Sequence, residues 1–218
     1  RQMCIRDSMT GAEIEVSNDR YFRTSELLCC LTDTPRTNLN YYYPKISRPY
    51  RYVRFTPPPP AYPTADCRAE IAELAFFDSV DSEEHLPSKA IYGGGPVDEN
   101  PAHDIDKACD DDWLTFYYSS GPRDSIVLDL QRASTIKKVL FVPRNDDNFI
   151  TPGNVYELFY QSGVKGWISL GVQTATTNEL VYRNIPEGAL LWLRNLTRGK
   201  EEQVFYVENG EQKFVGYE

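Results

Sequence analysis

Polar side chains are concentrated in one short segment, PRNDDNFITPGNVYELFY, between two runs that have the composition of β-strands. Its consecutive members are Arg144, Asn145, Asp146, Asp147, Asn148 and Phe149. A guanidinium can donate two parallel hydrogen bonds to vicinal hydroxyls or to a carboxylate. Asn and Asp supply the mixed donors and acceptors that a sugar requires, and a phenyl ring offers an apolar face to the C–H side of a pyranose. The segment therefore predicts either a glycan-binding loop or a structural clamp, in which Arg144 pairs with Asp146 or Asp147 and Phe149 packs beneath the loop.

A second group of oxygen-bearing side chains comprises Asp110, Asp111, Asp112 and Thr115. A hard cation such as Ca²⁺ binds about six to eight oxygens, which are drawn from carboxylates, backbone carbonyls and water. The alternative is a solvated acidic turn whose carboxylates, that of Asp112 in particular, accept hydrogen bonds from nearby backbone groups. Residue types alone leave both interpretations open.

The sequence contains none of the usual catalytic arrangements. His85 and His103 lie outside any Ser/His/Asp or Cys/His pattern, and no pair of carboxylates is placed as in glycoside hydrolases. The segment YGGGP lacks the Lys and the helix of a phosphate-binding loop. The five cysteines contain no CxxC pair that would bind zinc: Cys4, Cys29, Cys30, Cys67 and Cys109. We expect a protein that is not an enzyme.

Composition sets limits on the partners. The net charge of −9 argues against duplex nucleic acid and against anionic membranes. Apolar runs are far shorter than the ~18 residues of a membrane-spanning helix, so membrane insertion is not expected.

The elements that must position these side chains read as β-strands. Short runs rich in Tyr, Phe, Val and Ile are separated by turn residues every ~8–12 residues, which is typical of an antiparallel sandwich or barrel. The expected strands span residues 50–56, 69–78, 125–131, 135–143, 155–161, 166–173, 179–185, 189–196 and 202–210. Trp167 and Trp192 lie on strands whose alternation suits burial, and we expect both in the core. The predicted fold class is all-β.

Four parts of the chain differ in character. Residues 1–8 (RQMCIRDS) have the appearance of a translated sequencing adapter and are expected to be non-native. Residues 9–80 end in YRYVRFTPP…AEIAELAFFD, which is echoed near the C-terminus by ALLWLRNLTRGKEEQVFYVENG. The polar stretch at 81–88 reads as a linker, and residues 89–218 as a complete second unit.

The order of several motifs resembles that of the discoidin, or coagulation factor 5/8 type C, family. The matching pieces are KACDDDWLTFY, SIVLDLQRASTIKKVLFVPRNDDN, GNVYELFYQSGVKGWISLG and ALLWLRNLTRGKEEQVFYVENG. The likeness is strongest to modules on secreted Bacteroidetes proteins. It implies an antiparallel β-sandwich of the galactose-binding-like jelly-roll type over residues 89–218, preceded by the C-terminal part of a similar sandwich at residues 9–80. Two positions depart from the family pattern, since Asp111 and Gln131 replace glycines.

The resemblance also implies a function. Relatives bind carbohydrate through loops at one end of the sandwich, which would add Trp113 and Tyr117, together with Tyr118, to the loop residues 144–149. Relatives place a structural calcium ion at the Asp-rich turn, and this implies Asp110, Asp112, Thr115 and Glu208 as ligands, with Glu73 in the like position of the first unit.

We therefore expect a non-catalytic carbohydrate-binding module of a secreted, periplasmic or cell-surface protein, joined to upstream domains of the same polypeptide. One alternative is a structural or protein-interaction spacer that supports a catalytic domain, of transglutaminase or hydrolase type, without binding glycan. A second alternative is a fragment that covers a partner's active site.

Overall fold

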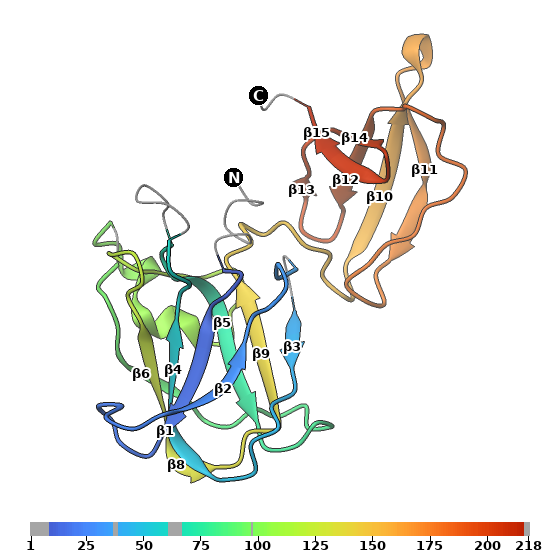
Figure 1. Cartoon of the computed structure of the whole chain (residues 1–218). Helices are drawn as coiled ribbons and strands as arrows, with labels where there is room; N and C mark the ends of the chain where they lie inside the picture. The colour runs from blue at the N-terminus through green and yellow to red at the C-terminus, as the bar shows by residue number, and fades with distance from the viewer. Residues whose placement is uncertain (1–8, 37–38, 61–66, 97, 216–218) are drawn as a thin grey trace. The chain divides into compact units, whose positions relative to one another are not determined.

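The computed structural model describes residues 9–36, 39–60, 67–96 and 98–215, with the side chain of Glu211 excepted. The non-native segment expected at residues 1–8 lies outside this part. The described chain is all-β: its strands form three antiparallel sheets, and its helical segments are short 3₁₀ turns. The chain divides into two compact units, Arg1–Asn148 and Phe149–Glu218 (Figure 1).

The first sheet of unit 1 has the strand order β2-β1-β4-β8-β6. Its strands are β1 (Glu13–Ser17), β2 (Glu26–Cys30), β4 (Tyr50–Thr56), β6 (Lys89–Tyr92) and β8 (Ile126–Ser134). Alternation is clear along β4, where Val53 and Phe55 are buried and the residues between them are more accessible. One face of this sheet therefore belongs to the core.

The second sheet of unit 1 has the order β3-β9-β5-β7. It contains β3 (Asn40–Tyr42), β5 (Glu70–Phe77), β7 (Tyr117–Tyr118) and β9 (Lys138–Pro143). Two 3₁₀ turns, η1 (Pro101–His103) and η2 (Ile105–Ala108), precede β7. Asn100 and Asp104 cap them by accepting hydrogen bonds from the backbone N–H groups of Ala102 and Ile105.

Both sheets of unit 1 contribute to one hydrophobic core. The first sheet supplies Ile14, Val53, Phe55, Ile126 and Leu128, and the second supplies Ile71, Leu74, Phe76, Val139 and Phe141. The rings of Phe55 and Phe141 stack with centroids 5.5 Å apart. Strand β5 is buried almost throughout, because its outer face also packs in a second cluster with Leu39, Trp113 and Phe116.

Unit 2 consists of one sheet with the order β11-β10-β12-β14-β15. Its strands are β10 (Val155–Gln161), β11 (Trp167–Thr174), β12 (Leu191–Asn195), β14 (Phe205–Glu208) and β15 (Glu211–Phe214), with β13 (Lys200–Glu201) paired to β12. The turn η3 (Gly163–Lys165) joins β10 to β11. Both hydrophobic clusters of the described residues lie in unit 1, so unit 2 has only a small buried set around Tyr156, Leu158 and Leu191.

The boundary expected at residues 81–88 is wrong for this structure. Strands on both sides of it pair with one another: β4 with β8, and β5 with β9. Residues 9–80 and 89–148 therefore form a single unit, and the division falls between Asn148 and Phe149. The strand expected at residues 179–185 is also absent. The chain there is irregular, and the Tyr182 hydroxyl lies 3.4 Å from the Tyr156 carbonyl oxygen.

Asp111 and Gln131, which stand where the discoidin pattern has glycine, both have a left-handed backbone. Asp111 has φ = 62° and Gln131 has φ = 64°. Gln131 lies where the pairing of β8 with β4 shifts register, and its N–H donates to Asp129 Oδ1 at 2.7 Å. This conformation costs a residue with a β-carbon about 1–2 kcal/mol, a cost that glycine does not have.

We expect Gln131→Gly to stabilise unit 1 by about 0.5–1 kcal/mol, since relief of backbone strain outweighs the added entropy of the unfolded chain. Denaturant unfolding of the full chain measures the change. Gln131→Ala is the matched control, because alanine removes the side chain but keeps the β-carbon. An equal gain in both variants would show that the Gln side chain, and not its backbone, was unfavourable.

Candidate functional site

The loop after β9 is fixed by the strand ends of the second sheet. Ile71 on β5 pairs with Pro143 at the end of β9, and the Arg144 N–H donates to the Glu70 carbonyl at 3.0 Å. Glu70 pairs in turn with Tyr118 on β7. The start of β5 and the end of β7 therefore lie beside the polar segment that the sequence singled out.

Arg144 is held on several sides. Its Nε donates to Asp146 Oδ1 at 2.7 Å and its Nη1 to Glu70 Oε2 at 3.1 Å. The guanidinium carbon lies 4.2 Å from the ring centroid of Phe116, which also stacks on His103 at 4.3 Å. The side chains of Arg144 and Glu70 are each only 13% exposed. This is the clamp interpretation of the loop, with Glu70 as an additional partner.

Asn145 anchors the turn that follows. It is 2% exposed, its Nδ2 donates to the Trp113 carbonyl at 2.9 Å, and its Oδ1 accepts from the Asp147 N–H at 2.8 Å. Asp146 and Asp147 both have positive φ, as the two central residues of a type I′ turn do. The Asn145 side chain is thus buried and hydrogen-bonded within the protein, whereas Asp146 and Asn148 are exposed.

The aromatic residues predicted for the same surface are not brought together there. Tyr117 is wholly buried in the core of unit 1, and its hydroxyl donates to the Gly94 carbonyl at 3.0 Å. Trp113 packs on the outer face of β5 and β9. Phe149 begins the other unit. The prediction that Tyr117 contacts a ligand is wrong, because its side chain does not reach the surface.

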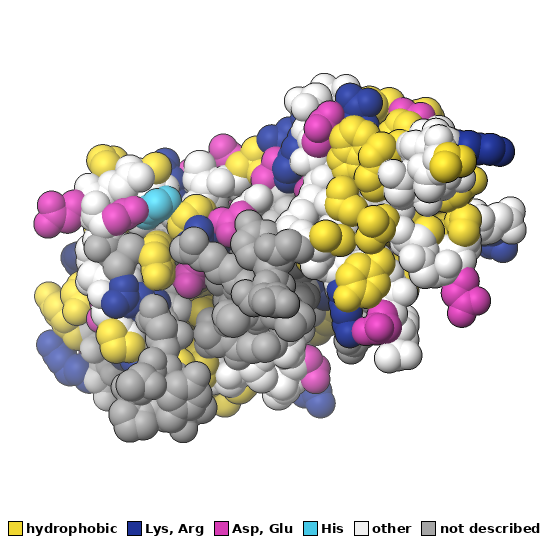
Figure 2. Space-filling model, turned by 90° about the horizontal axis from the view of Figure 1, so that it is seen from above, with side chains coloured by type: hydrophobic (Ala, Val, Ile, Leu, Met, Phe, Trp, Pro, Cys, Tyr) yellow, Lys and Arg dark blue, Asp and Glu magenta, His cyan; other side chains and the backbone are white. Residues whose placement is uncertain are grey.

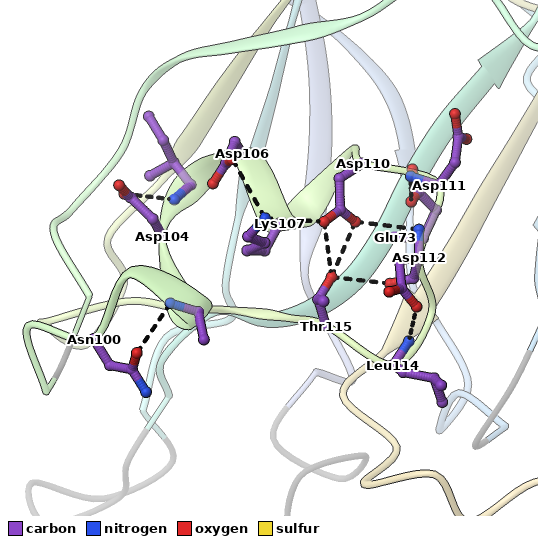
Figure 3. Close-up of polar contacts among 12 residues, drawn as sticks. Glu73, Asn100, Asp104, Asp106, Lys107, Asp110, Asp111, Asp112, Leu114 and Thr115 are labelled. Carbon is purple, nitrogen blue, oxygen red and sulfur yellow. Dashed lines mark hydrogen bonds and ion pairs between the residues drawn. The ribbon is translucent and has the colours of Figure 1, made fainter.

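The Asp-rich turn makes mainly local hydrogen bonds (Figure 3). Asp110 Oδ1 accepts from the Asp112 N–H at 3.2 Å, and Asp112 Oδ1 accepts from the Leu114 N–H at 3.0 Å. The Thr115 hydroxyl lies 2.9 Å from Asp110 Oδ2, and Lys107 Nζ lies 3.3 Å from the same oxygen. These contacts are those of the acidic-turn interpretation.

Glu73 connects this turn to the sheet. It lies on β5, is 2% exposed, and its Oε2 accepts from the Asp111 N–H at 3.0 Å. Burial is the main cause that raises the pKa of Glu73 to about 8. The nearby charges of Asp111 and Asp110 also raise this pKa, and the hydrogen bond from the Asp111 N–H lowers it. His85 Nε2 lies 3.0 Å from Asp111 Oδ1 on the outer side.

The four ligands predicted for calcium are divided between the two units, three in unit 1 and Glu208 in unit 2. Asp110 and Thr115 are in contact, but the Asp112 carboxylate is bonded to the Leu114 N–H, and Glu208 belongs to unit 2, where it pairs with Lys213. Within the described ranges, no set of three or more His, Cys, Asp or Glu side chains is arranged to hold a metal ion. Lys107 already supplies a positive charge to Asp110. The contacts of Asp110, Asp112 and Thr115 in unit 1 are therefore those of a hydrogen-bonded acidic turn, and they do not converge as the ligands of one ion would.

Unit 2 carries a group of three aromatic side chains, two of which, Trp167 and Trp192, were expected in the core. Phe159 lies opposite Trp192 in the register of β10 and β12, and their ring centroids are 5.6 Å apart. Trp167 on β11 also lies 5.6 Å from Trp192. We call Phe159, Trp167 and Trp192 the aromatic row. Trp167 is 37% exposed and the other two are half-buried, so the expectation of core tryptophans is corrected.

Polar side chains border the aromatic row. The Arg194 guanidinium lies 5.3 Å from the Trp192 ring centroid and its Nη2 3.5 Å from Glu201 Oε1. Glu157 Oε1 accepts from the Ser169 hydroxyl at 2.7 Å. Hydrophobic side chains gather on the surface of unit 2 in Figure 2. The sequence contained a signal for this face, because Ser169 shares the face of Trp167 in a strand that alternates.

No family model, curated protein or solved structure matches the chain. Among the described residues, no helix has the length and apolar character needed to cross a membrane.

Proposed function

We propose that this chain is a non-catalytic carbohydrate-binding module of a larger secreted or cell-surface protein. The observation that carries the proposal is the aromatic row, an accessible group of three rings on adjacent strands of one sheet. Pyranose rings have an apolar C–H face that stacks on aromatic side chains and a rim of hydroxyls that requires hydrogen bonds. Unit 2 offers rings for the apolar face and polar side chains for the hydroxyls.

The polar rim would come from Glu157, Arg194 and Gln161. All three lie on the face of β10 and β12 that carries Phe159 and Trp192. A carboxylate accepts hydrogen bonds from hydroxyls, a guanidinium donates to them in pairs, and an amide does both. Because such bonds largely replace bonds to water, the affinity would be modest and would depend on stacking.

The loop of residues 144–149 has a different part in this proposal. Arg144 and Asn145 hold the strand ends together and are not available to a sugar. We therefore place the proposed binding surface on the sheet of unit 2 and not on the loop. For unit 1, we propose that the two sheets around one core form a sandwich of the discoidin type. The contacts that hold Arg144 in place favour the second candidate function, a spacer without glycan binding, because they give the loop a structural role.

A glycan array followed by calorimetry tests the proposal on the full chain, with galactose- and glucuronate-type sugars as the first probes. Trp167→Ala is expected to weaken binding at least tenfold, about 1.4 kcal/mol, because it removes the most accessible ring. Trp167→Phe should retain part of the affinity.

Asn148→Ala is the matched control, since this residue is exposed on the loop predicted from the sequence. Loss of binding in Asn148→Ala with an unchanged Trp167→Ala would return the site to the loop. Absence of binding to every glycan, with a normal thermal melt, would favour the spacer function.

A further inference from the structure

A groove borders the outermost strand of the first sheet of unit 1. Strand β2 stands at the end of the order β2-β1-β4-β8-β6, so β1 is the strand that pairs with it. Residues 26–29 form one wall of the groove, and residues 43–48, which connect β3 to β4, form the other. The volume between the walls is about 510 Å³. The N–H and C=O groups of β2 that point away from β1 therefore face a groove and not a strand.

The opposite wall has the form of a strand without a partner. Along residues 43–47, exposed and half-buried side chains alternate, which is the pattern of an extended segment. Within the described ranges, no backbone hydrogen bond joins residues 43–48 to residues 26–29. Both walls therefore retain backbone groups with which a third extended segment can pair.

The groove combines an apolar floor with an accessible rim. Leu28 is buried in the core of unit 1, and Cys29 and Ile46 pack against that core. Leu27 and Tyr43, in contrast, are 53% and 57% exposed. Successive side chains of an extended segment point to opposite faces. Every second side chain of a segment in this groove would therefore contact the floor, and the others would face the rim and solvent.

The charges at the rim favour an acidic occupant. Glu26 already accepts hydrogen bonds from the Tyr50 hydroxyl and from Arg48 Nη2, the latter at 2.7 Å. Lys45 is exposed and forms no ion pair within the part of the chain that the structure describes. The charge available at the groove is therefore positive, although the whole chain carries −9. An Asp or Glu side chain complements it.

We infer that this groove binds an extended segment of a partner polypeptide, which adds a strand to the free edge of β2 and places an acidic side chain beside Lys45. Backbone hydrogen bonds to β2 supply affinity, and the floor and Lys45 supply selectivity. The five residues of β2 match a segment of about five residues, since both rise about 3.3 Å per residue.

A lone strand is the occupant that uses both walls, whereas a second copy of the chain that paired through its own β2 would use only one. The groove belongs to unit 1 and the aromatic row to unit 2. This binding site is therefore independent of the proposed function.

Peptide selection followed by NMR tests the site. A displayed library of seven-residue peptides is selected on the full chain, and we expect the enriched peptides to alternate apolar residues and to carry Asp or Glu. A synthetic copy of one such peptide is then titrated into ¹⁵N-labelled protein. Amide signals of residues 26–30 and 43–48 should shift, and the β2 amides that point away from β1 should exchange at least tenfold more slowly. Shifts confined to other elements, or a selection that enriches no peptide, would overturn the inference.

Charge reversal tests the role of Lys45. Lys45→Glu is expected to weaken binding of the acidic peptide at least tenfold and to strengthen binding of the same peptide with Lys in place of its acidic residue. Lys165→Glu is the matched control, because Lys165 is an exposed lysine in η3 of unit 2. Equal weakening in both variants would mean that only the net charge matters, which contradicts a site at β2.

A concentration series without peptide separates this site from self-association. We expect exchange of the β2 amides to be independent of protein concentration. If their protection rises with concentration, the free edge of β2 pairs with a second copy of the chain, and the inference of a partner peptide fails.

Discussion

Replacing Arg144 by alanine is expected to destabilise unit 1 by about 3 kcal/mol, the loss typical of breaking a largely buried ion pair. The change leaves the Glu70 carboxylate, 13% exposed, without its guanidinium partner and frees Asp146 from the turn. It also removes the contact with the Phe116 ring. A fall in the melting temperature on the order of 10 °C would accompany it. Denaturant unfolding of the full chain provides the free energy.

Arg48→Ala is the matched control for Arg144→Ala. Arg48 Nη2 contacts Glu26 Oε2 at 2.7 Å, a distance comparable to those of Arg144, but its side chain is 74% exposed. An exposed pair contributes less than about 1 kcal/mol because water and salt screen it. Equal losses in the two variants would mean that Arg144 is not a clamp. A glycan-binding Arg144 would instead show lost affinity with stability unchanged.

The β-rich class could be predicted because the residue types and the alternation typical of strands are visible in short segments of the sequence. Residues 50–56 alternate between buried and accessible positions as the sequence suggested, and β4 has those bounds. Turn residues between residues 161 and 167 likewise indicate the hairpin that β10 forms with β11. Such signals depend on the nearest neighbours in the chain, which the sequence displays directly.

Strand partners could not be predicted in the same way. β4 and β12 have similar alternation, yet β4 pairs with β8 whereas β12 pairs with β13 and β14. The pairing of β4 with β8 is supported by contacts such as that of Arg51 with Asp129, which are 78 residues apart. Alternation within a strand specifies which face is buried but not which strand lies beside it.

The surroundings of the candidate site residues could not be predicted from the sequence for a related reason. Arg144 and Asn145 look like ligand-binding residues because their partners, Glu70 and the Trp113 carbonyl, lie far away in the sequence. The tryptophans of unit 2 look like core residues because apolar neighbours flank them. Their exposure follows from the lack of a covering sheet in the described part of unit 2, a property of the assembled fold and not of any one strand.

Glu73→Gln is expected to stabilise unit 1 above pH 8 by on the order of 3 kcal/mol and to leave it nearly unchanged below pH 4.5. Burial raises the pKa of Glu73 from 4.5 to about 8, so between these values the folded state binds more protons than the unfolded state. Stability contributed by the protonated carboxyl is therefore complete below pH 4.5 and is lost as the pH rises towards 8. Gln keeps an oxygen that accepts from the Asp111 N–H and carries no charge.

Unfolding free energies of both proteins from pH 4 to pH 9 measure this difference, and Glu13→Gln is the control. Glu13 is exposed at the start of β1, so its replacement should change stability by less than about 0.5 kcal/mol. The calcium expectation makes the opposite prediction, because metal ligands must be deprotonated. If calcium raised the melting temperature at pH 8, and if Glu73→Gln abolished that rise and weakened the fold, Glu73 would be a metal ligand. A stabilised Glu73→Gln variant that is indifferent to calcium and to chelator would establish instead that the Asp-rich turn is held by its own hydrogen bonds.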